Sequence, residues 1–440
     1  MKFYKIKMYP ILILSIIIIG CNEKAETTKN KLVSIDVRAY VNSNDAISIK
    51  NEIERIEYIP LELTDDNSSM VGKIMDVILT KDYIFVLSDP TCGVLQFDIK
   101  GNFIRQVAKY GQGPGELLFP ISMYSVEEDS KLYITGAYQT TIYNFNGKFE
   151  EAFDRGGRMS FYSYPIGEGR VVETSSEGIP FEAKGHFGIG IFSNMGKGDT
   201  IMMKNNFSND KISPSKESGF KLTRCIPSDS GVLFSTMTND TIYRLTKDTI
   251  IPAFCWQRNL SEESLKSSYS LLNFIPTNTE LFLYDIIEFP ESICFRYVYK
   301  EKSFIMLYDK QSGKILSTST PYKWNDISNV DFWMTMWGIN NDIDHGVPIA
   351  PLHWYKNKKI SIQCTPASTI DYLRDKGMLK TAPDILKKIN GDENPIVIKD
   401  NIMLNPFRKI IFIIWQMSNR TPEYFLNLIR YYKDSKNLEI

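Results

Sequence analysis

Glycine and acidic residues at positions 111–116 (GQGPGE) are the first candidates for chemistry. The three glycines would let backbone N–H groups approach a phosphate, and Gln112 and Glu116 add polar side chains that could contact a ligand. No lysine follows, however, and Pro114 removes one donor. The favoured interpretation is structural: the glycines take positive φ in a tight crossing, and Glu116 accepts backbone amides or pairs with a basic side chain. Ligand binding is the alternative.

Residues 340–346 (NNDIDHG) place oxygen-bearing side chains at alternate positions, as at the start of a calcium-binding loop. The glycine comes one position late, and the twelfth position is Pro351 in place of glutamate. An exposed turn is therefore favoured over a metal site. Asp342, Asp344 and His345 remain candidates for ligand contacts or acid–base chemistry.

The rest of the chain offers only scattered groups for a site. It has no H-E-x-x-H, G-x-S-x-G or G-x-x-x-x-G-K-[ST] motif, so no catalytic residue, metal or cofactor is predicted. Arg224 and Arg296 are the basic partners that an enzyme would draw from separate loops. Trp337 is a candidate for stacking on sugars, with core packing as the alternative. The same two readings apply to Trp324, Trp333 and Trp354.

The beginning of the chain has the pattern of a bacterial lipoprotein signal. Three lysines precede the apolar run 11–19, which is too short to cross a bilayer. The sequence IIGC, which ends at Cys21, resembles a lipobox. It predicts a signal peptide over residues 1–20 and acylation of Cys21, with an ordinary secretory peptide as the alternative. The polar stretch 21–33 would then be a flexible tether.

Short β-strands account for most of the remaining chain. Residues 75–108 contain four runs, MDVILTK, DYIFVLS, GVLQFDI and FIRQVA, each rich in β-branched and aromatic residues and bounded by turn residues. They predict an antiparallel four-stranded meander, the blade from which a β-propeller is built. Two further runs, KLVSIDV and IERIEYIPLEL, come earlier. A leftover N-terminal strand is expected to complete the last blade and close the ring.

The blade pattern repeats along the chain. An aromatic residue near the end of a third strand is followed four positions later by a turn residue. This pattern occurs at Phe97/Gly101, Tyr143/Gly147, Phe192/Gly196 and Tyr243/Lys247, and Tyr308 continues it after a helical insertion near 261–276.

A sixth unit can be assembled from residues 332–339, 348–355, 359–365 and 394–400, with two helical pieces between 366 and 391. The fold predicted is an all-β, six-bladed β-propeller of four-stranded antiparallel blades with short helical insertions. It spans residues 34–400, followed by a C-terminal strand and helix over 401–440. Seven blades are the alternative.

The stretch 97–117 (FDIKGNFIRQVAKYGQGPGEL), with YIPLE, NDTIYRL, DIDHGVPIAP and ENPIVI, resembles the six-bladed β-propeller lipoproteins of gut Gram-negative bacteria, relatives of NHL-type propellers. The resemblance covers residues 53–399. It implies the propeller fold and a lipid-anchored place in the cell envelope, at the outer membrane. The extension 401–440 and His345 depart from the family pattern, and the family supplies no catalytic residues.

Two functions are weighed. The favoured one is a membrane-anchored, non-enzymatic binding or scaffold module for a glycan, peptide or protein partner. The alternative is a lyase or hydrolase acting on envelope carbohydrate or peptide, which would need a histidine, an arginine and a carboxylate to converge on the central funnel. The 51 basic and 52 acidic residues nearly balance, so no nucleic-acid partner is expected. A monomer is expected.

Overall fold

The computed structural model describes residues 32–402 with gaps at 90–92, 137–138, 156–161, 175, 178–188, 199, 205–220, 223, 229–230, 236–239, 248, 259–280, 301, 324–336, 352 and 356–358. The predicted signal peptide, the acylation site Cys21, most of the predicted tether, the insertion near 261–276 and nearly all of the extension 401–440 lie outside the described residues. Within the described residues, no helix is long and apolar enough to span a membrane.

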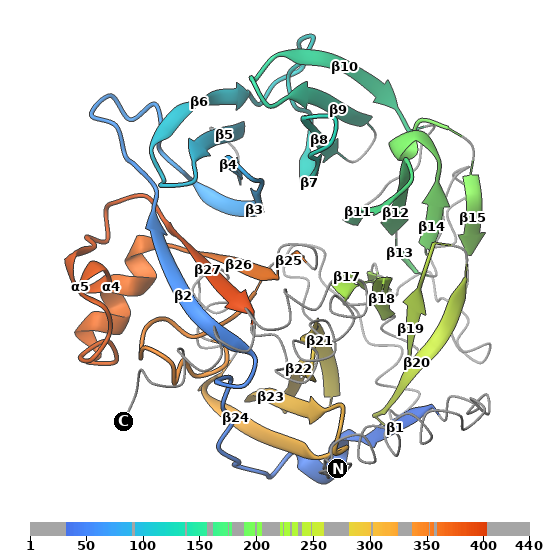
Figure 1. The fold of residues 1–440 in the computed structure, drawn as a ribbon, viewed down its shortest axis with the longest axis vertical. Helices are drawn as coiled ribbons and strands as arrows, with labels where there is room; N and C mark the ends of the chain where they lie inside the picture. The colour runs from blue at the N-terminus through green and yellow to red at the C-terminus, as the bar shows by residue number, and fades with distance from the viewer. Residues whose placement is uncertain are drawn as a thin grey trace, which may run out of the picture.

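Six β-sheets form the blades of a ring (Figure 1). Each blade is a four-stranded antiparallel sheet. In five blades the strands follow the chain order from the centre of the ring to its rim, and in the sixth an N-terminal strand takes the outermost place, so the predicted six-bladed propeller is confirmed. Blade 1 consists of β3 (Lys73–Leu79), β4 (Tyr83–Asp89), β5 (Gly93–Asp98) and β6 (Phe103–Ala108), the four strands predicted from the sequence. Blade 2 consists of β7 (Pro120–Val126), β8 (Lys131–Gly136), β9 (Gln139–Asn144) and β10 (Phe149–Asp154).

The remaining blades follow the same plan. Blade 3 consists of β11 (Tyr162–Gly167), β12 (Arg170–Thr174), β14 (Ile189–Phe192) and β15 (Thr200–Lys204). Blade 4 consists of β17 (Arg224–Ser228), β18 (Gly231–Ser235), β19 (Thr241–Leu245) and β20 (Ile250–Gln257). Blade 5 consists of β21 (Leu281–Glu288), β22 (Ser292–Tyr299), β23 (Lys302–Asp309) and β24 (Ile315–Lys323). Blade 6 consists of β25 (His353–Tyr355), β26 (Ile360–Thr365), β27 (Ile396–Ile402) and β2 (Ile53–Pro60).

The repeated aromatic residues lie at the ends of the third strands. In three blades the residue that follows the aromatic one accepts backbone hydrogen bonds that form the next turn. Asp98 Oδ1 accepts the backbone N–H groups two and four positions later at 2.8 and 2.9 Å. Asn144 Oδ1 accepts the equivalent pair at 3.0 Å each. Asp309 Oδ1 accepts those two and three positions later at 3.1 and 2.6 Å. Gly101 completes the first of these turns with φ of 92°, a conformation that favours glycine.

Strand β2 closes the ring by pairing antiparallel with β27, from Ile53 opposite Ile402 to Pro60 opposite Ile396. An N-terminal strand therefore completes the last blade, as predicted. The strand predicted over 332–339 is wrong for its described part, because residues 337–339 form only an isolated bridge, Ile339 to Ile349. Since β2 already supplies the fourth strand, Trp337 and Ile339 pack between blades 5 and 6 instead.

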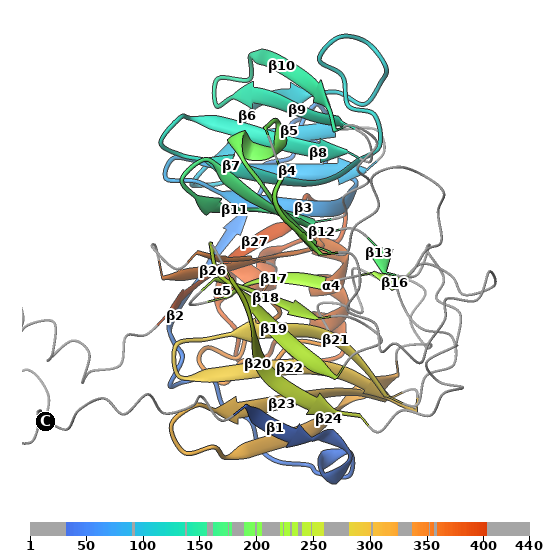
Figure 2. The ribbon, with the colours of Figure 1, turned by 90° about the vertical axis from the view of Figure 1, so that its right-hand side faces the viewer.

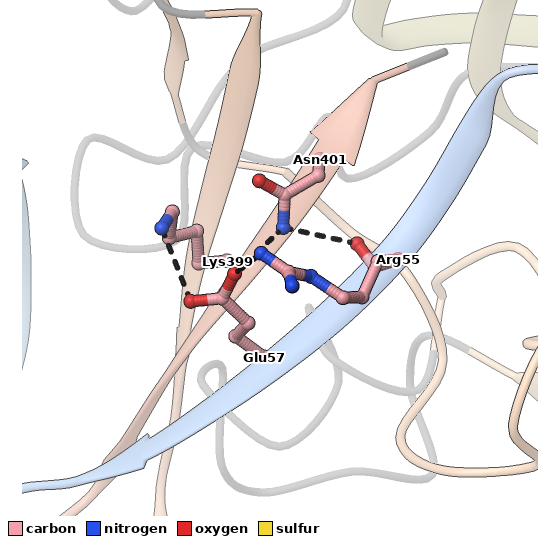
Figure 3. A network of polar contacts seen from close by, with 4 residues as sticks. All are labelled: Arg55, Glu57, Lys399 and Asn401. Atoms are coloured by element: carbon pink, nitrogen blue, oxygen red, sulfur yellow. Dashed lines mark hydrogen bonds and ion pairs between the residues drawn. The ribbon is translucent and has the colours of Figure 1, made fainter. Parts of the chain in front are cut away.

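A polar network covers the closing pair of strands (Figure 3). Glu57 on β2 accepts hydrogen bonds from Lys399 Nζ at 3.1 Å, Asn401 Nδ2 at 3.1 Å and Arg55 Nη2 at 2.5 Å. Burial alone would raise the pKa of Glu57, but the hydrogen bond and charge of Lys399 help to lower it below the usual value. The carboxylate therefore links the N-terminal strand to the last strand of the ring.

The position of strand β1 (Val33–Asp36) was not predicted from the sequence. The strand pairs in parallel with β20, from Val33 opposite Phe254 to Asp36 opposite Gln257, as a fifth strand on blade 4. A 3-10 helix, η1 (Val37–Tyr40), follows. The chain then contacts blade 5, where the Asp45 N–H donates to Ser317 O at 2.9 Å. Residues 33–60, which we call the N-terminal belt, thus contact blades 4, 5 and 6 in turn.

The two faces of the ring differ in the length of their connections. One face carries the turns that join the first to the second strand and the third to the fourth strand of each blade. None of these turns is longer than residues 193–199, which contain the 3-10 helix η2 (Asn194–Gly196). We call this the smooth face.

The opposite side, the loop face, carries all the other connections. These include the β6–β7 crossing (109–119) and the connection that holds α4 (Ala367–Asp375) and α5 (Asp384–Lys388). Both helices were predicted. The connections of blade 3 add β13 (Ser176–Glu177) and β16 (Lys221–Leu222), which pair with each other and stand beyond the blades in Figure 2.

The hydrophobic core lies between neighbouring blades. One cluster joins Ile78 and Phe85 of blade 1 to Met123 and Ile134 of blade 2. Another joins blade 5 to blade 6 through Trp337. Because each blade is covered on both sides, its central strands are mostly apolar, and Phe85 and Val94 are fully buried.

Candidate functional site

The β6–β7 crossing is a closed loop held by its own hydrogen bonds. Leu117 N–H donates to Lys109 O at 2.8 Å, and Gly111 N–H donates to Leu117 O at 3.0 Å. Inside the loop, Gly113 N–H donates to the Glu116 carboxylate at 2.8 Å, and Glu116 N–H donates to Gly113 O at 3.0 Å. The structural role predicted for Glu116, which is to accept a backbone amide, is confirmed.

The glycines of the crossing are required for two different reasons. Only Gly115 takes a positive φ, of 75°. A Cβ at Gly111 would overlap the Glu116 carboxylate, and one at Gly113 would crowd it at 3.0 Å. The prediction that the glycines serve positive φ is therefore correct for Gly115, whereas Gly111 and Gly113 leave room for the carboxylate.

The crossing is also attached to blade 2. The Tyr143 O–H donates to Gly115 O, and the Phe149 ring packs against Gly115. Burial and the nearby charge of Glu116 raise the pKa of Tyr143 to about 12. The loop is therefore a rigid support anchored to two blades.

An exposed aromatic pair, Tyr110 and Phe119, lies on this support. Their ring centroids are 6.5 Å apart and the rings meet edge to face at 85°. Tyr110 is 36% exposed. Phe119 is 60% exposed, the largest fraction among the exposed large hydrophobic residues of the described part. Phe119 also has φ of 46°, a strained conformation for a residue with a bulky side chain.

These two rings and the exposed Gln112 give the crossing a defined chemistry. Aromatic faces cover the apolar face of a sugar or a peptide side chain, and an amide can donate and accept hydrogen bonds beside them. Sequence analysis selected Gln112 and Glu116 but missed the rings. The signal available was that Tyr110 and Phe119 bracket the glycine loop, just before the inner strand β7.

Arg296 and Trp337, two residues predicted as ligand contacts, come together between blades 5 and 6. The Arg296 guanidinium lies 5.8 Å from the Tyr284 ring centroid and 5.9 Å from that of Trp337, and it pairs with Asp285. Trp337 donates through Nε1 to Phe304 O at 2.9 Å. Arg296 is only 1% exposed, so in this arrangement it joins blades and does not face solvent.

Asp342 and Asp344 hold the turn 340–346 against the N-terminal belt. Asp344 accepts hydrogen bonds from the Tyr58 hydroxyl at 3.0 Å and Asn341 Nδ2 at 2.7 Å, while Asp342 accepts one from the Ser48 hydroxyl at 2.6 Å. The expectation of an exposed turn is only partly correct, because Asn341 is 3% exposed. Within the described part of the chain, no group of three or more His, Cys, Asp and Glu side chains could hold a metal ion.

His345, with φ of 58°, and Asn340 are the exposed members of this turn. Arg224 lies at the start of β17, and its side chain is outside the described residues, as are His186 and the side chains of Trp324, Trp333, His353 and Trp354. The predicted site residues therefore occupy separate places: Gln112 and Glu116 in the β6–β7 crossing, Arg296 and Trp337 between two blades, and Asp342 to His345 against β2.

A buried carboxyl, Asp400, lies near the 340–346 turn. It is fully buried on β27, where the Ser361 hydroxyl donates to Oδ2 at 2.7 Å and Oδ1 has no hydrogen-bond partner among the described residues. Burial, with a smaller contribution from the charge of Asp344, raises the pKa of Asp400 to about 7, although the Ser361 hydrogen bond opposes the shift. Sequence analysis did not single out this residue.

Comparisons with known proteins are consistent with the fold. A family model described as "Domain of unknown function (DUF4934)" matches residues 32–399. A Bacteroides fragilis NCTC 9343 protein described as exported has a similar structure, with a TM-score of 0.60 and 14% identity over 84% of this chain and 99% of that chain. A DUF4221 family member from Bacteroides vulgatus ATCC 8482 has a TM-score of 0.45 and 9% identity over 80% and 98%. No curated protein matches the sequence significantly.

Proposed function

The chain belongs to the DUF4934 family, and from this premise we propose that it is an exported, lipid-anchored propeller that binds carbohydrate at its loop face. The family's description names no activity, so the site itself has to support the proposal. The lipoprotein pattern that ends at Cys21 supports export and anchoring at the cell envelope. The outer membrane is the membrane that the family resemblance favours.

The observation that carries the proposal is the Tyr110–Phe119 pair. Phe119 keeps 60% of its surface in water, although burial of such a side chain is worth about 1.5–3 kcal/mol. Its left-handed backbone costs a further ~1–2 kcal/mol. In the free protein the edge-to-face contact with Tyr110, worth about 0.5–1.5 kcal/mol, offsets only part of this cost. Such a ring is, however, preorganised to cover the apolar face of a sugar.

The polar groups near the pair support binding more than catalysis. Glu116 is the acidic group of the crossing, and its carboxylate accepts the Gly113 amide. Arg296 is paired with Asp285, and Asp344 holds Tyr58 and Asn341. Each of these candidate acid–base groups already has a structural role, and they lie in separate places. We therefore place the protein among non-enzymatic binding modules.

The test uses soluble protein that begins at Asn22, applied to a glycan array built from envelope and host polysaccharides. Phe119→Ala is compared with Ile99→Ala, a matched control that removes another exposed apolar side chain, 48% exposed, in a smooth-face turn. We expect the wild-type protein to bind a glycan without changing it chemically. Phe119→Ala should weaken that binding at least about tenfold, which corresponds to ~1.4 kcal/mol, and Ile99→Ala should leave it unchanged.

Two results would overturn the proposal. Cleaved glycan products would show an enzyme instead of a binding module. Recovery of only peptides or proteins in a parallel pull-down, with equal capture by Phe119→Ala, would show that the aromatic pair is not the recognition site.

A further inference from the structure

Both ends of the described chain leave the ring at the smooth face. Strand β27 ends at Ile402, whose N–H donates to Lys359 O at 2.9 Å, in the smooth-face turn between β25 and β26. Strand β1 is parallel to β20, which starts from the smooth-face turn 246–249. Val33 is thus at the smooth-face end of β1, and Figure 2 shows β1 running toward the side of β13 and β16.

The predicted tether is short relative to the thickness of the ring. Eleven residues lie between Cys21 and Val33, and a flexible chain of that length has a root-mean-square span of about 20 Å. A seven-residue strand such as β3 separates the two faces by about 23 Å at ~3.3 Å per residue. An acylated Cys21 therefore keeps the smooth face near the membrane. The loop face could reach the bilayer only if the tether ran back along the ring over more than its root-mean-square span, which lowers its conformational entropy.

Lysine side chains recur on the smooth face near its rim. Each turn between the third and fourth strands of blades 1 to 5 carries one exposed lysine: Lys100, Lys148, Lys197, Lys247 and Lys314. Lys197 pairs with Glu151, and Lys247 pairs with Glu168 at 3.1 Å. Lysines near an anionic lipid surface are attracted to it electrostatically. The exposed acidic residues in the described turns of this face lie instead in the inner turns of blades 1 to 3: Asp82, Glu128, Asp129 and Glu168.

The sequence that continues from Ile402 has the composition of a membrane-surface segment. Residues 403–440 contain six basic and three acidic side chains, together with seven aromatic ones. Basic and aromatic side chains together favour the interface between lipid and water.

We propose that the smooth face rests on the lipid surface that holds acylated Cys21, so that the loop face and its Tyr110–Phe119 pair point away from the membrane. This orientation rests on the anchoring part of the proposed function but not on the identity of the ligand. In this proposal the partner of the smooth face is a phospholipid bilayer.

The test uses the full-length acylated protein in vesicles of phosphatidylethanolamine and phosphatidylglycerol. A photo-crosslinking amino acid replaces Lys100, Lys148 or Lys314 on the smooth face. In matched controls it replaces the equally exposed Lys73, Gln112 or Lys302 on the loop face. We expect lipid adducts to form several-fold more from the smooth-face positions. Equal yields, or more adduct from the loop face, would overturn the orientation.

A charge variant and a binding assay separate this inference from the proposed function. The triple variant K100E/K148E/K314E should lower lipid adducts at a probe placed at Lys81, whereas K73E/K302E should not. Glycan binding is measured on the same vesicles. Loss of glycan binding with an unchanged pattern of lipid adducts would contradict only the proposal of a carbohydrate ligand. Protein that stays in solution would contradict both the lipid anchor and the orientation.

Discussion

Tyr110 and Phe119 hold their rings 6.5 Å apart at the two ends of a loop whose interior is filled by the carboxylate of Glu116. The carboxylate points into the loop and accepts the Gly113 N–H. It fixes the backbone on which the rings stand, and the hydrogen bond from the Tyr143 hydroxyl of blade 2 to Gly115 O fixes the loop from outside. The proposed recognition and the support of the loop thus belong to different side chains of one short crossing.

Replacing Phe119 by glycine should separate stability from binding. Glycine takes φ of 46° without strain, and little packing is lost because the ring is 60% exposed. We expect the free energy of unfolding to rise by ~0.5–1 kcal/mol while glycan binding is lost. Urea unfolding and the glycan array measure the two effects. A destabilised Phe119→Gly variant would show that the ring packs within the fold and is not held for a ligand.

The overlap between Gly111 and Glu116 can be tested by a double-mutant cycle. Gly111→Ala should destabilise the protein by ~1–3 kcal/mol, because its Cβ would displace the carboxylate from the Gly113 amide. The same substitution in a Glu116→Ala background should cost much less. If both backgrounds lose equal stability in urea unfolding, the carboxylate does not fill the loop as the structure shows.

Asp400 should make the fold less stable as the pH rises. Its pKa of about 7 lies above the ordinary value of 3.8, so the folded state binds the proton more tightly than the unfolded state. The stabilisation is therefore complete below pH ~4 and is lost as the pH rises toward 7. Asp400→Asn cannot ionise and should be more stable at pH 8, by the order of a few kcal/mol. The exposed Asp384→Asn serves as control.

This prediction has a clear contrary outcome. Urea unfolding of the wild type and Asp400→Asn from pH 4 to pH 8 should give curves that diverge as the pH rises. Parallel curves would mean that Asp400 is ionised, or solvated, throughout that range.

Glu57 should show the opposite pH dependence, because its pKa is lowered in the folded state. Its contribution is present above the ordinary value of 4.5 and is lost as the pH falls through the folded value. Glu57→Gln should cost ~0.5–1 kcal/mol at pH 7, a modest loss since 31% of the side chain is exposed and screened. As the pH falls below the folded pKa of Glu57, the urea concentrations at which the two proteins unfold should converge. A difference that persists at acid pH would point to packing instead of charge.

The fold could be predicted because its signals are local. Asp98, Asn144 and Asp309 follow an aromatic residue and form turns from their own side chains, so the repeat can be seen without knowledge of the partner strands. The position of β1 could not be predicted, because its parallel partner β20 is more than 200 residues away and any apolar edge would suit it. The strand assigned to 332–339 failed for the same reason, since apolar periodicity does not distinguish a strand from packing between blades.

The site was only half predictable. Gln112 and Glu116 were selected because glycines surround them, but the exposure of Phe119 depends on a backbone angle that no residue pattern announces. The high pKa of Asp400 arises from complete burial beside Asp344, which is 56 positions earlier in the chain. Arg296 and Trp337 were selected separately for ligand contact, and only the structure shows that they contact each other.

The N-terminal belt has a consequence for the order in which the molecule can form. Residues 53–60 are synthesised early, yet their partner β27 begins at Ile396 and is the last of the described strands to be made. During synthesis β2 must therefore stay unpaired until that strand emerges. Loop closure over such a separation is slow. We expect a chain truncated before Ile396 to remain susceptible to protease throughout, while the complete chain becomes resistant in a single step.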